Sequence, residues 1–224
     1  MPTLLLLLAG PLQSWGTTSR FDRRETDQEP SKSGVLGLVC AALGRDRTMP
    51  LDDLAALRLG VRVDRPGVLR YDYQTASNVI AADQSKRHPT TVSRRFYLSD
   101  AIFLVGLEGE DRALLHTIHA ALRKPVWPLA LGRKSYLPSP SPYLDDGLQE
   151  WGLETALTTY PAYGRRERGT PASDTRHCRL VLEDRETTEG ALRMDQPLAP
   201  FAERRFGARI VKMGFCDVPE PTDP

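Results

Sequence analysis

The order of the apolar segments constrains the fold of this 224-residue chain more than any other feature of its sequence. The unbroken apolar run Leu4–Ala9 is typical of a buried strand. Residues 33–43 carry apolar side chains at helical spacing, with serines at their start and Gly44 after their end as caps. Residues 59–64 alternate between apolar and polar side chains, as a strand does. The first part of the chain therefore predicts strand, helix and strand.

A second strand–helix pair follows after a long excursion. Residues 67–97 lack helical periodicity and are predicted to form two extended arms joined by a polar tip. Residues 100–107 then form a buried strand, 110–122 a helix, and 129–132 a short strand. Without the excursion the order is βαββαβ, the ferredoxin-like split βαβ arrangement, so we expect an α+β fold.

The composition of the chain changes after the second strand–helix pair. Alternate prolines from Pro138 to Pro142 form a linker-like run, and strands are predicted at Cys178–Glu183 and Ala208–Phe215. We therefore expect a ferredoxin-like domain over residues 1–137, a small β-rich region over 138–216, and a disordered tail over 217–224.

Balanced charge and few cysteines exclude several classes of protein. Lys and Arg number 30 against 29 Asp and Glu, so the chain is not uniformly basic, although one face can still be. The three cysteines include no CxxC pair, so we expect no disulfide framework, no metal site and no cofactor. The N-terminal apolar run is too short for a signal peptide or a membrane span, so we expect a cytoplasmic protein without a membrane partner. No catalytic motif gives a positive case for an enzyme.

Basic and aromatic residues alternate in and beside the excursion. Between Arg62 and Tyr97 there are seven basic residues against three acidic ones, so this segment has a net charge of +4. Tyr71, Tyr73 and Phe96 are interleaved with them. Cations neutralise phosphates and aromatic rings stack on unpaired bases, so the pattern is typical of a nucleic-acid-binding surface. The alternative is a solvated hairpin with ordinary cross-strand tyrosine pairs.

Two short segments have the chemistry of phosphate sites. Gly132–Ser135 combines a glycine, two cations and a hydroxyl after the last predicted strand. Ser31–Gly34 begins the first predicted helix, where free N–H groups and the positive end of the helix dipole favour an anion. The alternatives are exposed charge before a linker and a plain helix cap.

These segments occur together in an order that resembles the CasD family, the subunit of type I-E CRISPR Cascade that caps the backbone of the complex. The resemblance is carried by LLLLLAGPLQSWG at the start, PSKSGVLGLVCAALGR around the first helix, and LGRKSYLPSPSP after the second. The matching positions are Ala9–Gly16, Pro30–Leu38 and Leu131–Ser135. The resemblance spans most of Met1–Pro142 and fades in the C-terminal third, apart from Phe206–Phe215.

The resemblance implies an RRM-like, RAMP-type ferredoxin-like domain in which the excursion over 67–97 is a protruding β-hairpin thumb. It implies a non-catalytic subunit in antiviral defence that binds the 5′ handle of CRISPR RNA. Its implied neighbours are the Cascade backbone subunit and the large PAM-recognising subunit, with target DNA met only through the complex. The alternative is a metal-independent endoribonuclease that processes CRISPR precursor RNA, with His88, the only histidine of the thumb, as its general base.

The candidate RNA-binding residues are the polar, basic and aromatic groups of these segments: Gln13, Arg20, Lys32, Ser33, Gly34, Tyr73, Arg94, Arg95, Arg133, Lys134 and Ser135. Gln13 is a candidate for reading a base edge. Trp15 either stacks on a base or packs in the core, and the core is favoured. Arg94 and Arg95 are neighbours, so on a regular strand they point to opposite faces. We expect the thumb to be mobile in the free subunit and to become ordered on RNA and the adjacent subunit.

Overall fold

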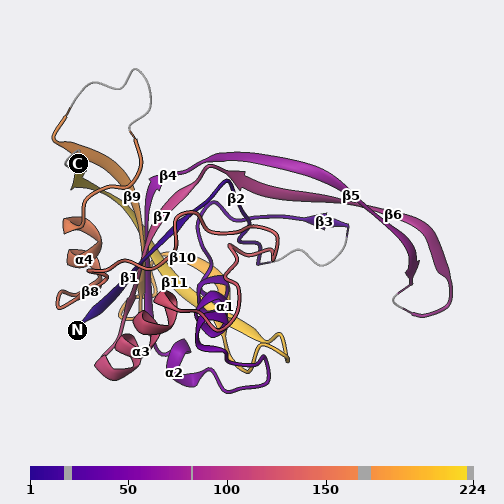
Figure 1. Cartoon of the computed structure of the whole chain (residues 1–224), viewed down its shortest axis with the longest axis horizontal. Coiled ribbons are helices and arrows are strands. Elements are labelled where there is room, and N and C mark those ends of the chain that lie inside the picture. The colour runs from indigo at the N-terminus through magenta and orange to yellow at the C-terminus, as the bar shows by residue number, and fades with distance from the viewer. Residues whose placement is uncertain (18–21, 82, 166–172, 221–224) are drawn as a thin grey trace.

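The computed structural model describes residues 1–17, 22–81, 83–165 and 173–220. A body of strands and helices carries one long curved hairpin that extends far from it (Figure 1). In chain order the elements are β1 (Thr3–Ala9), β2 (Leu12–Gln13), β3 (Arg23–Arg24), α1 (Lys32–Leu43), α2 (Asp52–Ala55), β4 (Arg58–Arg65), β5 (Val68–Ile80), β6 (Arg87–Ser99), β7 (Ile102–Glu108), α3 (Arg112–Arg123), β8 (Leu148–Gln149), α4 (Leu153–Thr159), β9 (Thr175–Asp184), β10 (Ala191–Pro197) and β11 (Phe206–Pro219).

Most strands belong to one sheet of seven, in the order β10-β11-β9-β4-β7-β1-β8. Every neighbouring pair in this sheet is antiparallel. The helix α1 connects β1 to β4, and α3 follows β7. The prediction of a fold that mixes helices with a sheet is therefore confirmed.

The leucine run forms β1, which is buried along its whole length. Successive side chains of a strand point to opposite faces of the sheet, so the run can be apolar throughout only if both faces are covered. Leu4, Leu6 and Leu8 pack into a core with residues of α1 and α3. Leu5 and Leu7 pack into a second core with residues of α4.

The caps of α1 are those that the sequence predicts. The Ser31 hydroxyl accepts a hydrogen bond from the Gly34 amide at 3.3 Å, which satisfies one free N–H group of the first turn. Gly44 ends the helix with a φ of 69°, in the left-handed region that glycine adopts without strain. The predicted helix over 110–122 is also present as α3, with Asp111 as its cap.

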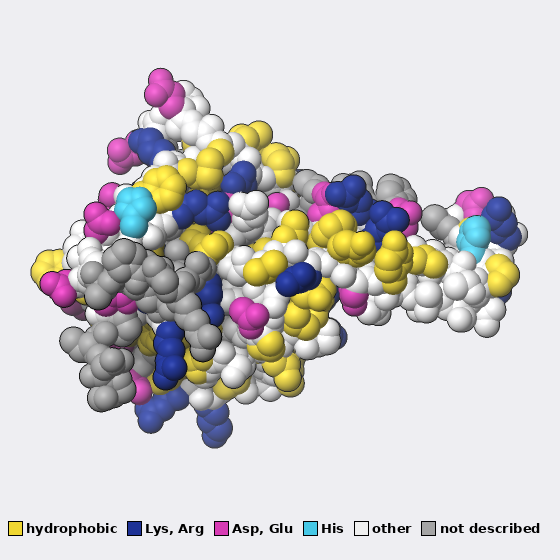
Figure 2. Space-filling model, turned by 90° about the horizontal axis from the view of Figure 1, so that it is seen from above, with side chains coloured by type: hydrophobic (Ala, Val, Ile, Leu, Met, Phe, Trp, Pro, Cys, Tyr) yellow, Lys and Arg dark blue, Asp and Glu magenta, His cyan; other side chains and the backbone are white. Residues whose placement is uncertain are grey.

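The excursion over 67–97 forms a β-hairpin, as predicted. Its arms β5 and β6 pair from Val68 with Ser99 to Ile80 with Arg87. At the root of the hairpin, β6 also pairs with β2, antiparallel, and with β3, parallel. Figure 2 shows hydrophobic and basic side chains next to each other along the hairpin. We call this hairpin, β5 and β6 with the turn between them, the thumb.

Two predictions about the segment after α3 are wrong. Residues 129–132 form a loop, because β8 pairs with the edge of β1 where the last strand of the unit was expected. The proline run is packed against β1, so it is not a free linker. The Ser139 amide donates to the Ala9 carbonyl at 2.8 Å, and the Leu7 amide donates to the Pro142 carbonyl at 3.1 Å.

The C-terminal third continues the main sheet. β9 pairs with β4, and β11 pairs with β9, so the region expected over 138–216 shares a sheet with the first half of the chain. The tail expected to be disordered over 217–224 starts inside β11, which runs to Pro219. The Pro219 carbonyl accepts from the Ala162 amide at 2.8 Å, which holds this end in place. Residues 221–224 lie outside the described part of the chain.

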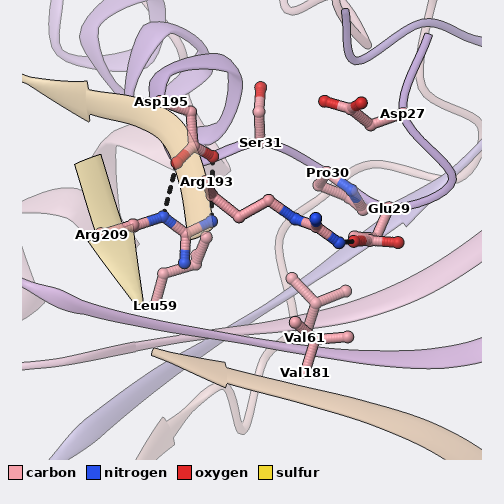
Figure 3. A pocket seen from close by; sticks show the side chains of 10 residues that line it. All are labelled: Asp27, Glu29, Pro30, Ser31, Leu59, Val61, Val181, Arg193, Asp195 and Arg209. Carbon is pink, nitrogen blue, oxygen red and sulfur yellow. Dashed lines mark hydrogen bonds and ion pairs between the residues drawn. The ribbon is translucent and has the colours of Figure 1, made fainter. Parts of the chain in front are cut away.

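A buried ionic network joins the start of α1 to β9 and β10. The Lys32 ammonium lies 3.0 Å from the Glu183 carboxylate, and both side chains are buried. The Lys32 amide donates to Asp195 at 2.6 Å, and Arg209 donates to the same carboxylate, also at 2.6 Å. Figure 3 shows this carboxylate beside a cavity of about 10 Å³, room for no more than one water molecule. The network therefore fixes α1 against strands far away in sequence.

Replacing Glu183 with alanine should lower the free energy of unfolding by about 3–5 kcal/mol, because it leaves the Lys32 ammonium buried without its counter-charge. Lys32→Met should cost less, since Glu183 keeps its bond to Arg185 at 2.9 Å. Urea unfolding at neutral pH, followed by circular dichroism, measures both. The double variant should be more stable than Glu183→Ala alone. A double variant no more stable than that single variant would show that the ammonium is not the cause.

Candidate nucleic-acid interface

A groove of about 960 Å³ runs along α1 between the root of the thumb and the turn that precedes β11. Its walls come from separate parts of the sequence: the segment from β2 to β3, helix α1 with the residues that follow it, β6, and the loop after α3. Phe201 and Phe206 close it from the C-terminal side. Its lining includes Arg24, Glu25, Ser33, Gly34, Arg45, Arg47, Arg95, Trp127, Gly132, Arg133, Lys134, Phe201 and Phe206.

The charge of this groove is strongly positive. Six Arg and Lys side chains line it, and among the described residues Glu25 is the one acidic side chain that does. Arg47, Arg95 and Lys134 form no ion pair within the described part of the chain. Cations without a carboxylate partner are free to neutralise the phosphates of a nucleic acid.

Arg133 and Gly132 shape the groove at the root of the thumb. The Arg133 guanidinium donates to the Phe96 carbonyl and to the Tyr136 hydroxyl, each at 2.8 Å. Gly132 has a φ of 90°, and a Cβ there would lie 1.7 Å from the Ser14 carbonyl oxygen, so no other residue fits. The guanidinium of Arg133 is thus hydrogen-bonded mainly within the protein.

Lys134 and Ser135 follow this fixed turn and are exposed. Lys134 lines the groove, whereas Ser135 does not. Of the four residues predicted to form a phosphate site, Lys134 is therefore the cation that lines the groove without an ion-pair partner among the described residues.

The start of α1 is only partly open to an anion. The Lys32 amide already donates to Asp195, and the Gly34 amide to the Ser31 hydroxyl. A protein carboxylate thus occupies the place at the helix N-terminus where the sequence predicted a phosphate. Ser33 and Gly34 still line the groove.

The prediction that Lys32 binds phosphate is wrong for this structure. Its side chain is 0% exposed and its ammonium faces Glu183. Burial lowers the pKa of Lys32 to about 8, and the Glu183 carboxylate opposes this shift. The residue stabilises α1 instead of meeting a ligand.

Gln13 is also buried, so the prediction that it reads a base edge is wrong for this structure. Its amide donates to the Leu8 carbonyl at 3.1 Å and to the Ala101 carbonyl at 2.8 Å. Its oxygen accepts from the Trp15 indole N–H at 3.1 Å. Trp15 is 1% exposed, which confirms that it packs in the core. Gln13 and Trp15 therefore both belong to the buried interior beneath the groove.

The predicted binding residues of the thumb lie on two different surfaces. Arg95 lines the groove, whereas its neighbour Arg94 stacks over the Tyr73 ring at 5.4 Å. Tyr73 is 56% exposed and lies 6.0 Å from Tyr71, ring to ring. Arg94 and Tyr73 therefore form a separate exposed patch on the thumb. Arg20 lies outside the described residues.

The predicted site lacked several lining residues, among them Arg24, Arg45, Arg47, Trp127, Phe201 and Phe206. Trp127 stands between Pro125 and Pro128, and an aromatic residue between two helix-breaking prolines was a usable sign of an exposed ring. The two phenylalanines reach the groove through pairing of β10 with β11, which no local pattern reveals.

Among the described helices, none is long and apolar enough to cross a membrane.

Comparison with known proteins identifies the family. The model of the CRISPR-associated protein Cas5 family matches residues 3–212. The Cascade subunit CasD of Escherichia coli K12 is 35% identical over 179 residues, which cover 72% of this chain and 78% of that protein. The chain therefore belongs to the Cas5 family of CRISPR-associated proteins.

Two solved structures are similar over almost the whole chain. A crystal structure of a Cas protein is 50% identical, with a TM-score of 0.78 and coverage of 98% of both chains. A chain of a CRISPR RNA-guided surveillance complex is 33% identical, with a TM-score of 0.75 and coverage of 97% of this chain and 91% of that one. The fold, with its thumb and C-terminal strands, is thus shared with a component of such a complex.

Replacing Lys134 or Arg95 with alanine should weaken binding to single-stranded RNA at low salt. Each variant should also reduce the slope of log K against log salt by roughly 0.7–1, because one phosphate contact is lost. Fluorescence anisotropy over a salt series measures this. Lys124→Ala is the matched control, since Lys124 is exposed at the end of α3 and does not line the groove. Equal slopes in all variants would place the RNA elsewhere.

Proposed function

We propose that this chain is a non-catalytic RNA-binding subunit of a type I-E CRISPR Cascade complex, where it binds the 5′ handle of CRISPR RNA and caps the backbone. The observation that carries the proposal is the groove, with six basic side chains and exposed aromatic rings among its lining. That combination suits a single strand of nucleic acid, which offers phosphates and unpaired bases together. The likeness to CasD and to a chain of an RNA-guided surveillance complex supports the same assignment.

The proposal includes a ferredoxin-like unit of the RAMP type. The order β4-β7-β1-β8, all antiparallel, with α1 after β1 and α3 after β7, supports it, because the split βαβ arrangement has this order. Here β8 takes the place of the last strand. The strands β9, β11 and β10 then extend the free edge of β4.

The thumb is proposed as the second contact with the complex. Its Tyr73 and Arg94 patch is exposed, and its arms expose further apolar residues such as Leu69, Val92 and Ile80. An exposed apolar surface on a soluble subunit is typical of a protein interface. We assign it to the backbone subunit, and we expect the large PAM-recognising subunit to contact the body of the chain, with target DNA met only through the complex. The proposed location is the cytoplasm.

The competing function, a metal-independent endoribonuclease, requires a positioned general base. His88 lies on β6 close to the tip of the thumb and is exposed. Its side chain forms no hydrogen bond or ion pair within the described residues. A catalytic base is normally held by a partner and near the bound substrate, so this position favours the non-catalytic reading.

Incubation of the purified chain with repeat RNA should leave the RNA uncut, because His88, the candidate general base, does not line the groove. Denaturing electrophoresis, with and without EDTA, measures this. His88→Ala should bind repeat RNA as the native chain does. Specific cleavage that is lost in His88→Ala would establish the nuclease and end the non-catalytic proposal.

Replacing Ala76–Thr91 with a Gly-Ser turn should leave the body folded and impair assembly with the other Cascade subunits. Thr75 pairs with Val92 just outside the replaced residues, so the new turn closes the hairpin at its native register. Size-exclusion chromatography of the reconstituted complex, together with nuclease protection of its CRISPR RNA, measures the effect. A control that replaces only residues 81–86 keeps both arms and should assemble better. Normal assembly and protection in the longer replacement would show that the thumb is not an assembly element.

A further inference from the structure

One end of the groove is walled by three aromatic rings, of which Phe201 also packs against the main core. Trp127 is 43% exposed and Phe206 is 37% exposed. Phe201, partly buried, lies 6.5 Å from Phe206, ring to ring, at an interplanar angle of 42°. Within the described residues the Trp127 ring stacks on no other aromatic ring. We call Trp127, Phe201 and Phe206 the aromatic corner.

The backbone around these rings is fixed before any ligand arrives. The Trp127 amide donates to the Ala41 carbonyl at 3.1 Å, which ties the loop to the end of α1. On the other side, the Ala202 amide donates to the Arg47 carbonyl at 2.9 Å. The Arg47 guanidinium in turn donates to the Phe201 carbonyl at 3.0 Å. Both walls of the corner are therefore anchored to the same helix and the segment that follows it.

Charge at the corner points to an anionic ligand. Arg45 is neutralised by Asp53, with two hydrogen bonds of 2.7 and 2.5 Å. Arg47 is exposed and forms no ion pair among the described residues, so its positive charge is available at the corner. Exposed rings beside a guanidinium that is paired with no carboxylate among the described residues fit a nucleotide, with its flat base and its phosphate, better than they fit an apolar peptide.

We propose that the aromatic corner is a stacking subsite for one unpaired base of single-stranded RNA, with Arg47 at the adjoining phosphate. The proposal rests on the proposed RNA-binding function and adds a defined place for one base. The base would stack on the exposed Trp127 ring, with Phe206 at the opposite wall of the groove. Stacking on an aromatic face tolerates any base, so the subsite sets the path of the strand and not its sequence.

The test uses the full chain with the change Trp151→Phe, because Trp151 is exposed outside the groove and Trp15 is buried. Trp127 is then the exposed tryptophan that reports on binding. The probe is a single-stranded repeat-derived RNA and a series in which each nucleotide in turn is abasic. RNA should quench Trp127 fluorescence, and one abasic position should weaken binding about fivefold or more, the loss of one stack.

Trp127→Ala should weaken binding of the intact RNA by a similar factor and remove the effect of that abasic position. Trp127→Phe should restore most of the affinity, which separates stacking from a folding defect. Trp151→Ala is the matched control and should bind as the native chain does.

Three results would overturn the proposal. Trp127→Ala that binds RNA normally, with an unchanged abasic profile, would rule out the stack while leaving the RNA-binding function in place. If Trp127→Ala binds RNA normally but fails to assemble with purified Cascade subunits, the aromatic corner contacts a protein and not RNA. Absence of RNA binding by the native chain, at low salt, would end the proposed function and the subsite together.

Discussion

The buried contacts of Lys32 with Glu183 and of its amide with Asp195 hold the groove in shape. They fix the start of α1 against β9 and β10, while the loop at Trp127 ties the end of α1 to the segment after α3. The helix is therefore held at both ends by parts of the chain that are far apart in sequence. Because α1 is the floor between the thumb root and the turn before β11, its position sets the width of the groove.

Local patterns predicted the elements that depend on local chemistry. The leucine run, the serine and glycine caps of α1, the periodicity of α3 and the two arms of the thumb each follow from neighbouring residues. The strand predicted at 129–132 is absent because β8 pairs with the edge of β1 in its place, and tertiary contacts decide which segments pair. For the same reason the C-terminal strands were expected in a separate region although they join β4.

The candidate site was predicted less well than the fold, and burial is the reason. Gln13 and Lys32 are polar residues in short motifs, and a motif does not tell whether a side chain faces a ligand or a neighbouring strand. In this chain both face inward and satisfy buried partners, as buried polar groups must. The predictions for Lys134 and Arg95 differ, because both residues line the groove. Lys134 follows Arg133, whose guanidinium donates to the Phe96 carbonyl, and Arg95 lies in β6, whose backbone pairs with β5.

The net charge of +1 conceals how this chain distributes its cations. Many arginines are neutralised inside the fold, as Arg62 is by Asp64 and Arg209 by Asp195. Part of the negative charge of the chain is thus paired with structural arginines, whereas Arg47, Arg95 and Lys134 in the groove form no ion pair among the described residues. A balanced composition is therefore compatible with a surface that attracts a polyanion, since long-range attraction depends on local and not total charge. The thumb repeats this arrangement on a smaller scale, with Arg94 stacked on Tyr73 and no carboxylate paired with it among the described residues. Under the proposed function the groove binds RNA, whereas this patch, together with the exposed apolar residues of the thumb, contacts the backbone subunit.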